Sequence, residues 1–247
     1  MQNLNDVTRL PDGFDGQVRL FPLPNLVVFP HAMQPLHLFE PRYVEMVKEA
    51  LEGDRLITMA TLIQPSSVDW PTNQAPISPT VCIGKIVTHS EQEDNRHNVL
   101  LVGIRRARIV AEIDAGKAYR LAQVELIEDS EEASNDSRSL SLKSDLLDAF
   151  GEVMPVGKSV QQNLHQLMAD QMSLGPITDI VGYTLPFSLE EKLVLLGQGD
   201  VAERAKFLLE CIKSGSVQFS TDSDDESDDS SGDFPSGQVF PPPFSMN

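Results

Sequence analysis

The spacing of apolar residues changes character along the chain. Between residues 18 and 127, short apolar or alternating runs predict β-strands. These strands are expected at 55–63, 81–88, 98–103, 105–113 and 119–127. One helix is predicted among them, beginning at Pro41 and ending at Gly53, for which we expect the left-handed backbone that often closes a helix.

Prolines set the expected shape of two other segments. The apolar stretch 18–39 is interrupted by Pro22, Pro24, Pro30 and Pro35, so it should form short extended pieces with turns at these prolines. Residues 64–80 hold four further prolines around Trp70 and show no periodicity, which predicts a long loop.

From residue 139 the apolar residues recur every three to four positions, which predicts five helices in succession. Ser188 with Glu191 has the spacing of a capping box, and Asp200 with Glu203 sets up a similar helix start. We expect Gly215 to end the last helix. The fold class is therefore α+β, with a β-rich part followed by a helical bundle.

The predicted organisation has five parts. They are a flexible N-terminal arm (1–17), a β-rich part (18–127), an acidic linker (128–138), a helical bundle (139–214) and a disordered acidic tail (215–247).

The net charge of −18 argues against a nucleic-acid partner, since such binding needs clustered Lys and Arg. The acids concentrate in 128–136 and in 215–247, neither of which contains a base. The basic cluster Arg105, Arg106 and Arg108 should be split between the two faces of a strand. The N-terminus does not resemble a signal peptide, and no apolar run is long enough to span a bilayer, so we expect a cytoplasmic protein with no membrane partner.

No motif predicts catalysis or a bound metal. Gly151 to Ser159 approaches a phosphate-binding loop but has five residues between its glycines and follows a helix. The five histidines lack helical metal-ligand spacing, and no nucleophile elbow is present. Cys82 and Cys211 are expected to be inert buried thiols. We therefore expect no enzyme activity, no catalytic residue, no cofactor and no metal site.

Three features suggest binding, each with a simpler structural alternative. The apolar segment 20–43 either packs in the core or lines a groove for extended peptide. Trp70 either covers the β-rich part or serves as an exposed anchor. Phe240-Pro-Pro-Pro-Phe244 is either a plain chain end or a polyproline-II docking ligand.

Three stretches of the sequence carry recognisable motifs. The first is Leu20-Phe21-Pro22-Leu23, then Val28-Phe29-Pro30, then Pro35 to Tyr43 with its Phe-Glu-Pro-Arg-Tyr helix start. The second is Val81-Cys-Ile-Gly84-Lys-Ile86, followed after a polar turn by Leu100 to Ile109 with Gly103 and Arg106. The third is the helical region from Leu185 to Leu208. Together these stretches resemble the Lon N-terminal domain family, and the resemblance covers about 18–213.

The resemblance implies a PUA-like β-barrel followed by helices, in a stand-alone bacterial member without ATPase or peptidase domains. It further implies a non-catalytic module that recognises unfolded or extended polypeptide or a protein partner, for example as an adaptor in protein quality control or proteolysis. An RNA-binding PUA-like protein is the alternative. The oligomeric state stays open. Candidate peptide-binding residues are Phe21, Leu26, Phe29, Phe39, Arg42, Tyr43 and Trp70. Arg42 either orients a partner carbonyl or pairs with Glu40, and all of these residues could equally serve the fold.

Overall fold

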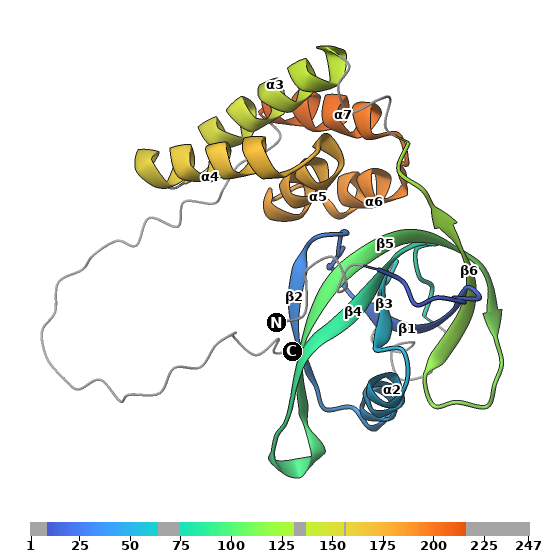
Figure 1. Ribbon diagram of the computed structural model, residues 1–247. Coiled ribbons are helices and arrows are strands. Elements are labelled where there is room, and N and C mark those ends of the chain that lie inside the picture. Colours follow the sequence, from blue (N-terminus) through green and yellow to red (C-terminus); the bar gives the residue numbers. More distant parts are fainter. Residues whose placement is uncertain (1–8, 64–74, 131–136, 156, 216–247) are drawn as a thin grey trace, which may run out of the picture.

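The protein is described by a computed structural model that covers residues 9–63, 75–130, 137–155 and 157–215. A β-barrel with one helix forms the first part, and helices stack above it (Figure 1). The strands are β1 (Gln17–Leu23), β2 (Met33–Leu38), β3 (Leu56–Thr61), β4 (Thr80–Glu91), β5 (His97–Ile113) and β6 (Arg120–Ile127). The helices are α2 (Pro41–Glu52), α3 (Ser137–Val153), α4 (Lys158–Gln171), α5 (Leu174–Thr184), α6 (Leu189–Gly197) and α7 (Val201–Lys213), with a 3-10 turn η2 (Glu93–Asn95) between β4 and β5. The α+β prediction is confirmed.

Five strands close into a ring. β1 pairs with β3 in parallel and with β6 in antiparallel fashion, and β4 joins β3 to β5. The pairing of β5 with β6 closes the barrel, so β5 pairs with β4 along its first two thirds and with β6 along its last part. β2 is added to the first half of β5, with Met33 opposite Val102 and Leu38 opposite His97.

Two expectations about the strands are wrong. The predicted strands 98–103 and 105–113 form one long strand, β5, which stays continuous because register shifts against β4 and β6 absorb the bending. Pro22 and Pro35 lie inside β1 and β2 and not in turns. Pro22 pairs with Ala60 beyond the last residue that pairs with β6, and Pro35 lies on a strand paired on one side, so neither proline removes a needed donor. The predicted turns at Pro24 and Pro30 are confirmed.

α2 begins at Pro41 as predicted, but the backbone at its C-terminal end differs from the prediction. Gly53 has φ −115° and is not left-handed, while Arg55 takes the positive φ of 63°. The Arg55 Nε donates to the Ile86 carbonyl at 3.1 Å, a contact that accompanies this less favoured backbone.

Successive side chains of a strand point to opposite faces of the sheet, and both faces of this sheet carry buried side chains. On β1, Phe21 joins a large core that continues through α2 into α3, α5, α6 and α7. The neighbouring Leu20 joins a second cluster on the other face, which Leu10 and Phe14 partly cover. One continuous apolar core therefore links the barrel to the helices.

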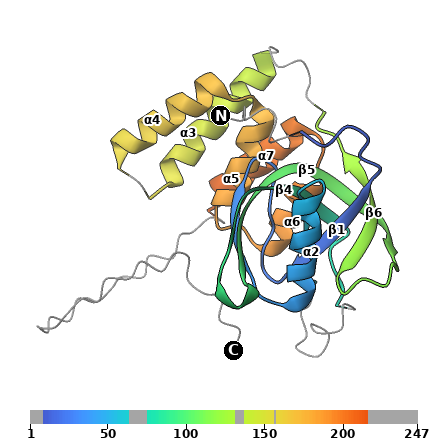
Figure 2. The same cartoon turned by 60° about the horizontal axis from the view of Figure 1, so that its bottom comes forward.

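The helices form a layered stack above one end of the barrel. α5 and α6 lie next to the barrel, and α3 packs against α4, α5 and α7 (Figures 1 and 2). The predicted capping box is confirmed, with the Ser188 Oγ accepting from the Glu191 N–H at 3.2 Å and Glu191 accepting from the Ser188 N–H at 2.8 Å. Asp200 caps α7 by accepting from the Glu203 N–H at 3.0 Å, without the return bond of a capping box, and Gly215 follows α7 with φ 74°. Within the described residues, no helix is both long enough and apolar enough to cross a bilayer.

Candidate functional site

A buried ionic network joins the barrel to the helices. Arg106 on β5 lies between Asp179 of α5, with which it pairs, and Asp129, whose Oδ1 is 2.8 Å from its Nη1. Arg204 of α7 donates to both oxygens of Asp129 at 2.8 Å. The side chains of Arg106, Asp179 and Arg204 are almost fully buried, while Asp129 is partly exposed.

The surroundings satisfy most of the remaining polar groups. Arg204 Nε donates to the Thr178 hydroxyl at 3.0 Å, and the His31 ring lies 3.1 Å from the second oxygen of Asp179. Burial alone would raise the pKa of Asp129, but the hydrogen bond from Arg204 and the charges of Arg106 and Arg204 outweigh it and lower this pKa below its usual value. The geometry of the network fixes the helices relative to the barrel.

This network corrects one sequence inference. Asp129 was placed in an acidic linker outside the folded parts, yet its carboxylate contacts two buried arginines. Within the arginine cluster, Arg106 is buried, Arg105 is half-buried and Arg108 is exposed.

Most of the candidate peptide-binding residues lie in the interior. Phe21 and Tyr43 are buried and meet edge to face, with ring centroids 4.6 Å apart. Phe29 is fully buried, and its ring lies beside Gly182 of α5. Leu26 is half-buried. These four residues thus contribute to the core that supports the surface.

The other three candidates differ from these. Arg42 pairs with Glu40 at 2.7 Å and lies 4.6 Å from the Tyr43 ring centroid, so the predicted pairing with Glu40 is present. Phe39 is 55% exposed. Trp70 lies outside the described residues.

Phe39 ends a row of exposed side chains along β2. Alternate residues of β2 are buried and exposed, and the exposed side chains at its start and middle belong to Met33, Pro35 and His37. Met33 is 62% exposed, and the His37 and Phe39 rings lie 6.0 Å apart. We call Met33, Pro35, His37 and Phe39 the β2 row. Its spacing of two residues matches the side-chain period of an extended chain.

The free edge of β2 is poorly suited to backbone pairing with another strand. Gly103 donates to the Ala32 carbonyl, so alternation directs the backbone groups of Met33, Pro35 and His37 away from β5. Pro35 has no N–H, and its carbonyl accepts from Gln34 Nε2 at 2.8 Å. The Met33 carbonyl accepts from the Tyr183 hydroxyl at 3.4 Å. The Met33 and Pro35 carbonyls are thus already bonded within the chain, and this edge presents mainly the side chains of the β2 row.

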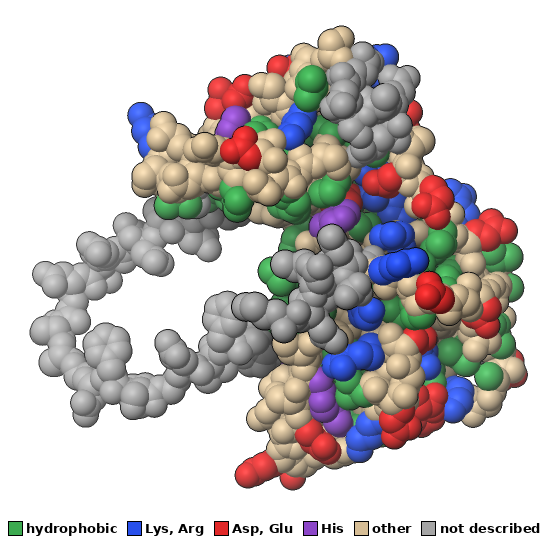
Figure 3. Space-filling model, in the orientation of Figure 1, with side chains coloured by type: hydrophobic (Ala, Val, Ile, Leu, Met, Phe, Trp, Pro, Cys, Tyr) green, Lys and Arg blue, Asp and Glu red, His purple; other side chains and the backbone are tan. Residues whose placement is uncertain are grey.

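A second apolar surface lies on α4. Val160, Leu164 and Leu167 recur at intervals of four and three residues and so share one face of the helix. Val160 is 56% and Leu167 60% exposed, while Leu164 is half-buried. We call these three residues the α4 face. α4 projects beyond the barrel on the side where β2 lies, and the space-filling view shows apolar side chains along the lower side of α4 (Figures 1 and 3).

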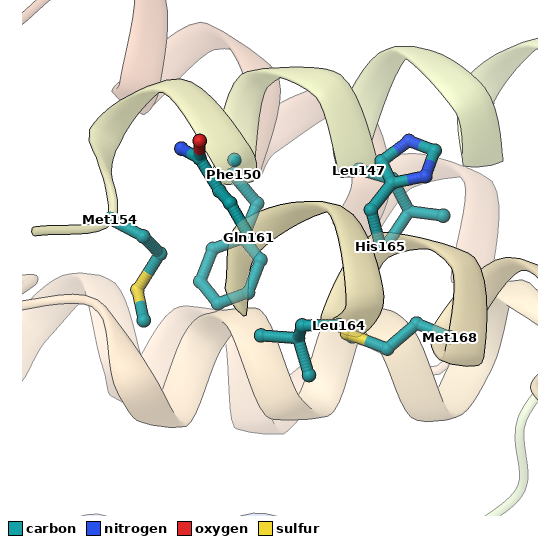
Figure 4. Close-up of a pocket in the computed structure, with 8 residues that line it drawn as sticks. Leu147, Phe150, Met154, Gln161, Leu164, His165 and Met168 are labelled. Atoms are coloured by element: carbon teal, nitrogen blue, oxygen red, sulfur yellow. The ribbon is translucent and has the colours of Figure 1, made fainter. Parts of the chain in front are cut away.

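A small apolar pocket lies at the root of the α4 face. Leu147, Phe150 and Met154 of the α3 side meet Leu164 and Met168 of α4 there (Figure 4). Gln161 and His165 lie at its rim. Gly151 lies in the last turn of α3 and Ser159 in the first turn of α4, as expected for a helix-to-helix turn.

The described residues offer little reactive chemistry. None of their His, Cys, Asp and Glu side chains gather in groups of three or more that could hold a metal ion. Both cysteines are free, Cys82 is fully buried, and burial raises the pKa of its thiol. Cys211 is partly exposed, and its pKa is raised by burial and by the Glu191 carboxylate. What the described residues do offer is the exposed, mainly non-polar surface of the β2 row and the α4 face.

Comparison with known proteins identifies the family of the chain. The chain belongs to the family of ATP-dependent protease La (LON) substrate-binding domains, whose family model matches residues 17–214. The resemblance seen in the sequence is thereby confirmed.

Curated relatives and solved structures agree with this assignment. Lon protease 1 of Bacillus subtilis is 27% identical over 195 residues, which cover 79% of this chain and 24% of that protein. Lon protease of Desulfosudis oleivorans is 25% identical and is covered to 23%. This chain thus spans about a quarter of the length of these relatives.

Two solved structures show the same fold. The Lon N-terminal domain protein from Xanthomonas campestris aligns with a TM-score of 0.57 at 18% identity, covering 78% of this chain and 97% of that one. The N-terminal domain of a Mycobacterium avium complex Lon protease aligns with a TM-score of 0.59 at 16% identity, covering 80% and 98%.

Proposed function

We propose that this chain recognises unfolded or extended polypeptide through the β2 row and the α4 face, without catalysing a reaction itself. The β2 row carries the proposal, because an apolar row with a two-residue period fits the exposed side chains of an extended chain. The family is named for substrate binding, which supports the same function. In this view the chain delivers substrates as a cytoplasmic adaptor in protein quality control or proteolysis.

The candidate residues take two different roles. Phe39 contacts polypeptide directly, while Arg42 orients a backbone carbonyl beside it. Phe21, Leu26, Phe29 and Tyr43 form the floor that holds β2 and α2 in place, as their burial supports. Trp70 is proposed as an additional anchor.

Nucleic acid and membrane surfaces are not proposed as partners. The chain carries a net charge of −18, and Arg106, one of its three clustered arginines, is buried in ion pairs. Apolar contact with neutral polypeptide segments does not suffer from this charge.

Binding of a permanently unfolded, alkylated model polypeptide to surface variants tests the proposal. Met33→Ser with Phe39→Ser removes the apolar ends of the β2 row, and we expect at least about a tenfold weaker affinity, since exposed aromatic anchors dominate such interfaces. Val194→Ser changes a 58% exposed residue on α6 and is the matched control. Equal affinity of the double variant and the control overturns the proposed site, and no binding by the wild type overturns the proposed function.

A further inference from the structure

The α4 face is an apolar surface on a helix that contributes few side chains to the core. Met168 is the one fully buried residue of α4 among those that the structure describes, and α4 packs on α3 alone to any large extent within the same residues. Between Lys158 and Asp170 the helix carries no acid and no Lys or Arg. A partner for this face should therefore be apolar and uncharged.

The chain itself contains a segment of that chemistry. Residues 234–247 carry no charged side chain. They include Phe240-Pro-Pro-Pro-Phe244, in which one phenylalanine stands on each side of three prolines. Prolines favour the polyproline-II conformation, so such a segment loses little conformational entropy when it docks. The acids of the tail lie before this segment, at positions 222–233.

We propose that Phe240–Phe244 docks on the α4 face of the same molecule and competes there with external polypeptide. This inference rests on the proposed function, for which it supplies a means of regulation. One phenylalanine ring packs on the apolar surface formed by Phe150, Met154 and Leu164, and the prolines run along Leu167. The bound segment then covers the α4 face until a stronger ligand displaces it.

The length of the connection fits an intramolecular contact. The tail leaves from Gly215 after α7, which packs on α3, and α3 carries α4. Two helix spacings amount to about 20 Å. Roughly two dozen residues, 216–239, separate Gly215 from Phe240, and a coil of that length has a root-mean-square span of about 25–30 Å. A connection matched to its span gives an effective concentration on the order of 1 mM, so even weak docking competes.

Methyl NMR of the full chain, without added polypeptide, tests the docking itself. Phe240→Ser with Phe244→Ser should shift the methyl signals of Val160, Leu164 and Leu167, while those of Val194 on α6 stay unchanged. Substituting Leu167→Ala in the wild type assigns the Leu167 signals. In the Leu167→Ala background, Phe240→Ser with Phe244→Ser should shift the Val160 signals less than in the wild type. Unchanged α4 signals overturn the proposal. Shifts that depend on protein concentration overturn it as well, because they indicate a second copy as the occupant.

Polypeptide binding separates this proposal from the proposed function. The Phe240→Ser and Phe244→Ser variant should bind the unfolded model polypeptide about 3–10 times more tightly than the wild type, because the competitor is gone. Shifted methyl signals without polypeptide binding in either protein leave the docking standing and overturn the proposed function. Binding of equal strength in both proteins, with unshifted methyl signals, overturns the docking alone.

Discussion

Arg204 and Asp129 face each other through two parallel hydrogen bonds of 2.8 Å each. Arg204 belongs to α7, near the end of the described chain, whereas Asp129 follows the last barrel strand. A planar guanidinium matched to a carboxylate in this way fixes direction as well as distance. Through Asp129 and Asp179, the same cluster reaches Arg106 on β5, so one network orients the helices that carry α4 relative to the barrel that carries β2.

Removing Arg204 should strongly destabilise the protein. Arg204→Leu leaves the buried Asp179 and the partly buried Asp129 with Arg106 as their remaining arginine partner. Breaking a buried ion pair on one side typically costs about 3–5 kcal/mol in the free energy of unfolding. Urea denaturation measures this loss, and Arg138→Ala on the exposed start of α3 should change stability by less than about 0.5 kcal/mol. Similar stabilities of the two variants would refute the assigned role.

Asp129 should make stability depend on pH in the acid range. Its pKa in the folded protein is lowered, so its stabilising contribution is fully present above the unfolded pKa of about 3.9 and is lost as the pH falls through the folded pKa. Asp129→Asn removes this contribution. The stability difference between wild type and variant should stay constant from pH 7 to about pH 5 and shrink below about pH 4. A difference that grows on acidification contradicts the assignment.

Gly103 should not tolerate a side chain. A Cβ at this position would lie 2.0 Å from the carbonyl oxygen of Phe29, so the backbone that carries Phe29 and leads to β2 must move. We expect Gly103→Ala to cost about 3 kcal/mol in thermal or urea unfolding. Gly157→Ala, which meets nothing within 4 Å, serves as the control. The account is wrong at this point if both variants are equally stable.

The two cysteines should react at very different rates. Cys82 is fully buried, whereas Cys211 is partly exposed, and burial raises the pKa of both thiols. Thiolate is the reactive form, so alkylation at pH 8 should be slow at Cys211 and should occur at Cys82 only on unfolding. Mass spectrometry of the alkylated native protein distinguishes the two sites. Early labelling of Cys82 would show that the core around β4 opens locally.

The sequence predicted the elements better than it predicted the surface they form. Regular spacing and end signals located α2 and the capped helices α6 and α7, because these features depend on neighbouring residues. The continuity of β5 could not be predicted, since a strand that changes partner along its length looks like two short strands. Asp129 was missed for a similar reason, because its partners Arg106 and Arg204 lie 23 and 75 residues away.

The candidate site shows the same division. An apolar segment predicts that residues are buried or bind, and only the fold decides between these outcomes. It buries Phe21, Phe29 and Tyr43 and exposes Phe39. Met33 went unnoticed although its alternation with Gln34 and Leu36 was visible, because the strand partner that sets the face was unknown. The α4 face lies in a segment predicted as part of a helical bundle, and helical spacing alone did not show that Val160 and Leu167 are exposed.

Hydrogen exchange of the full chain, with and without a saturating unfolded polypeptide, tests the central claim most directly. Bound polypeptide should slow amide exchange in 33–39 and in α4, while α2 and α6 exchange as before. Protection confined to other elements, or no protection at any described residue despite measured binding, would contradict the account.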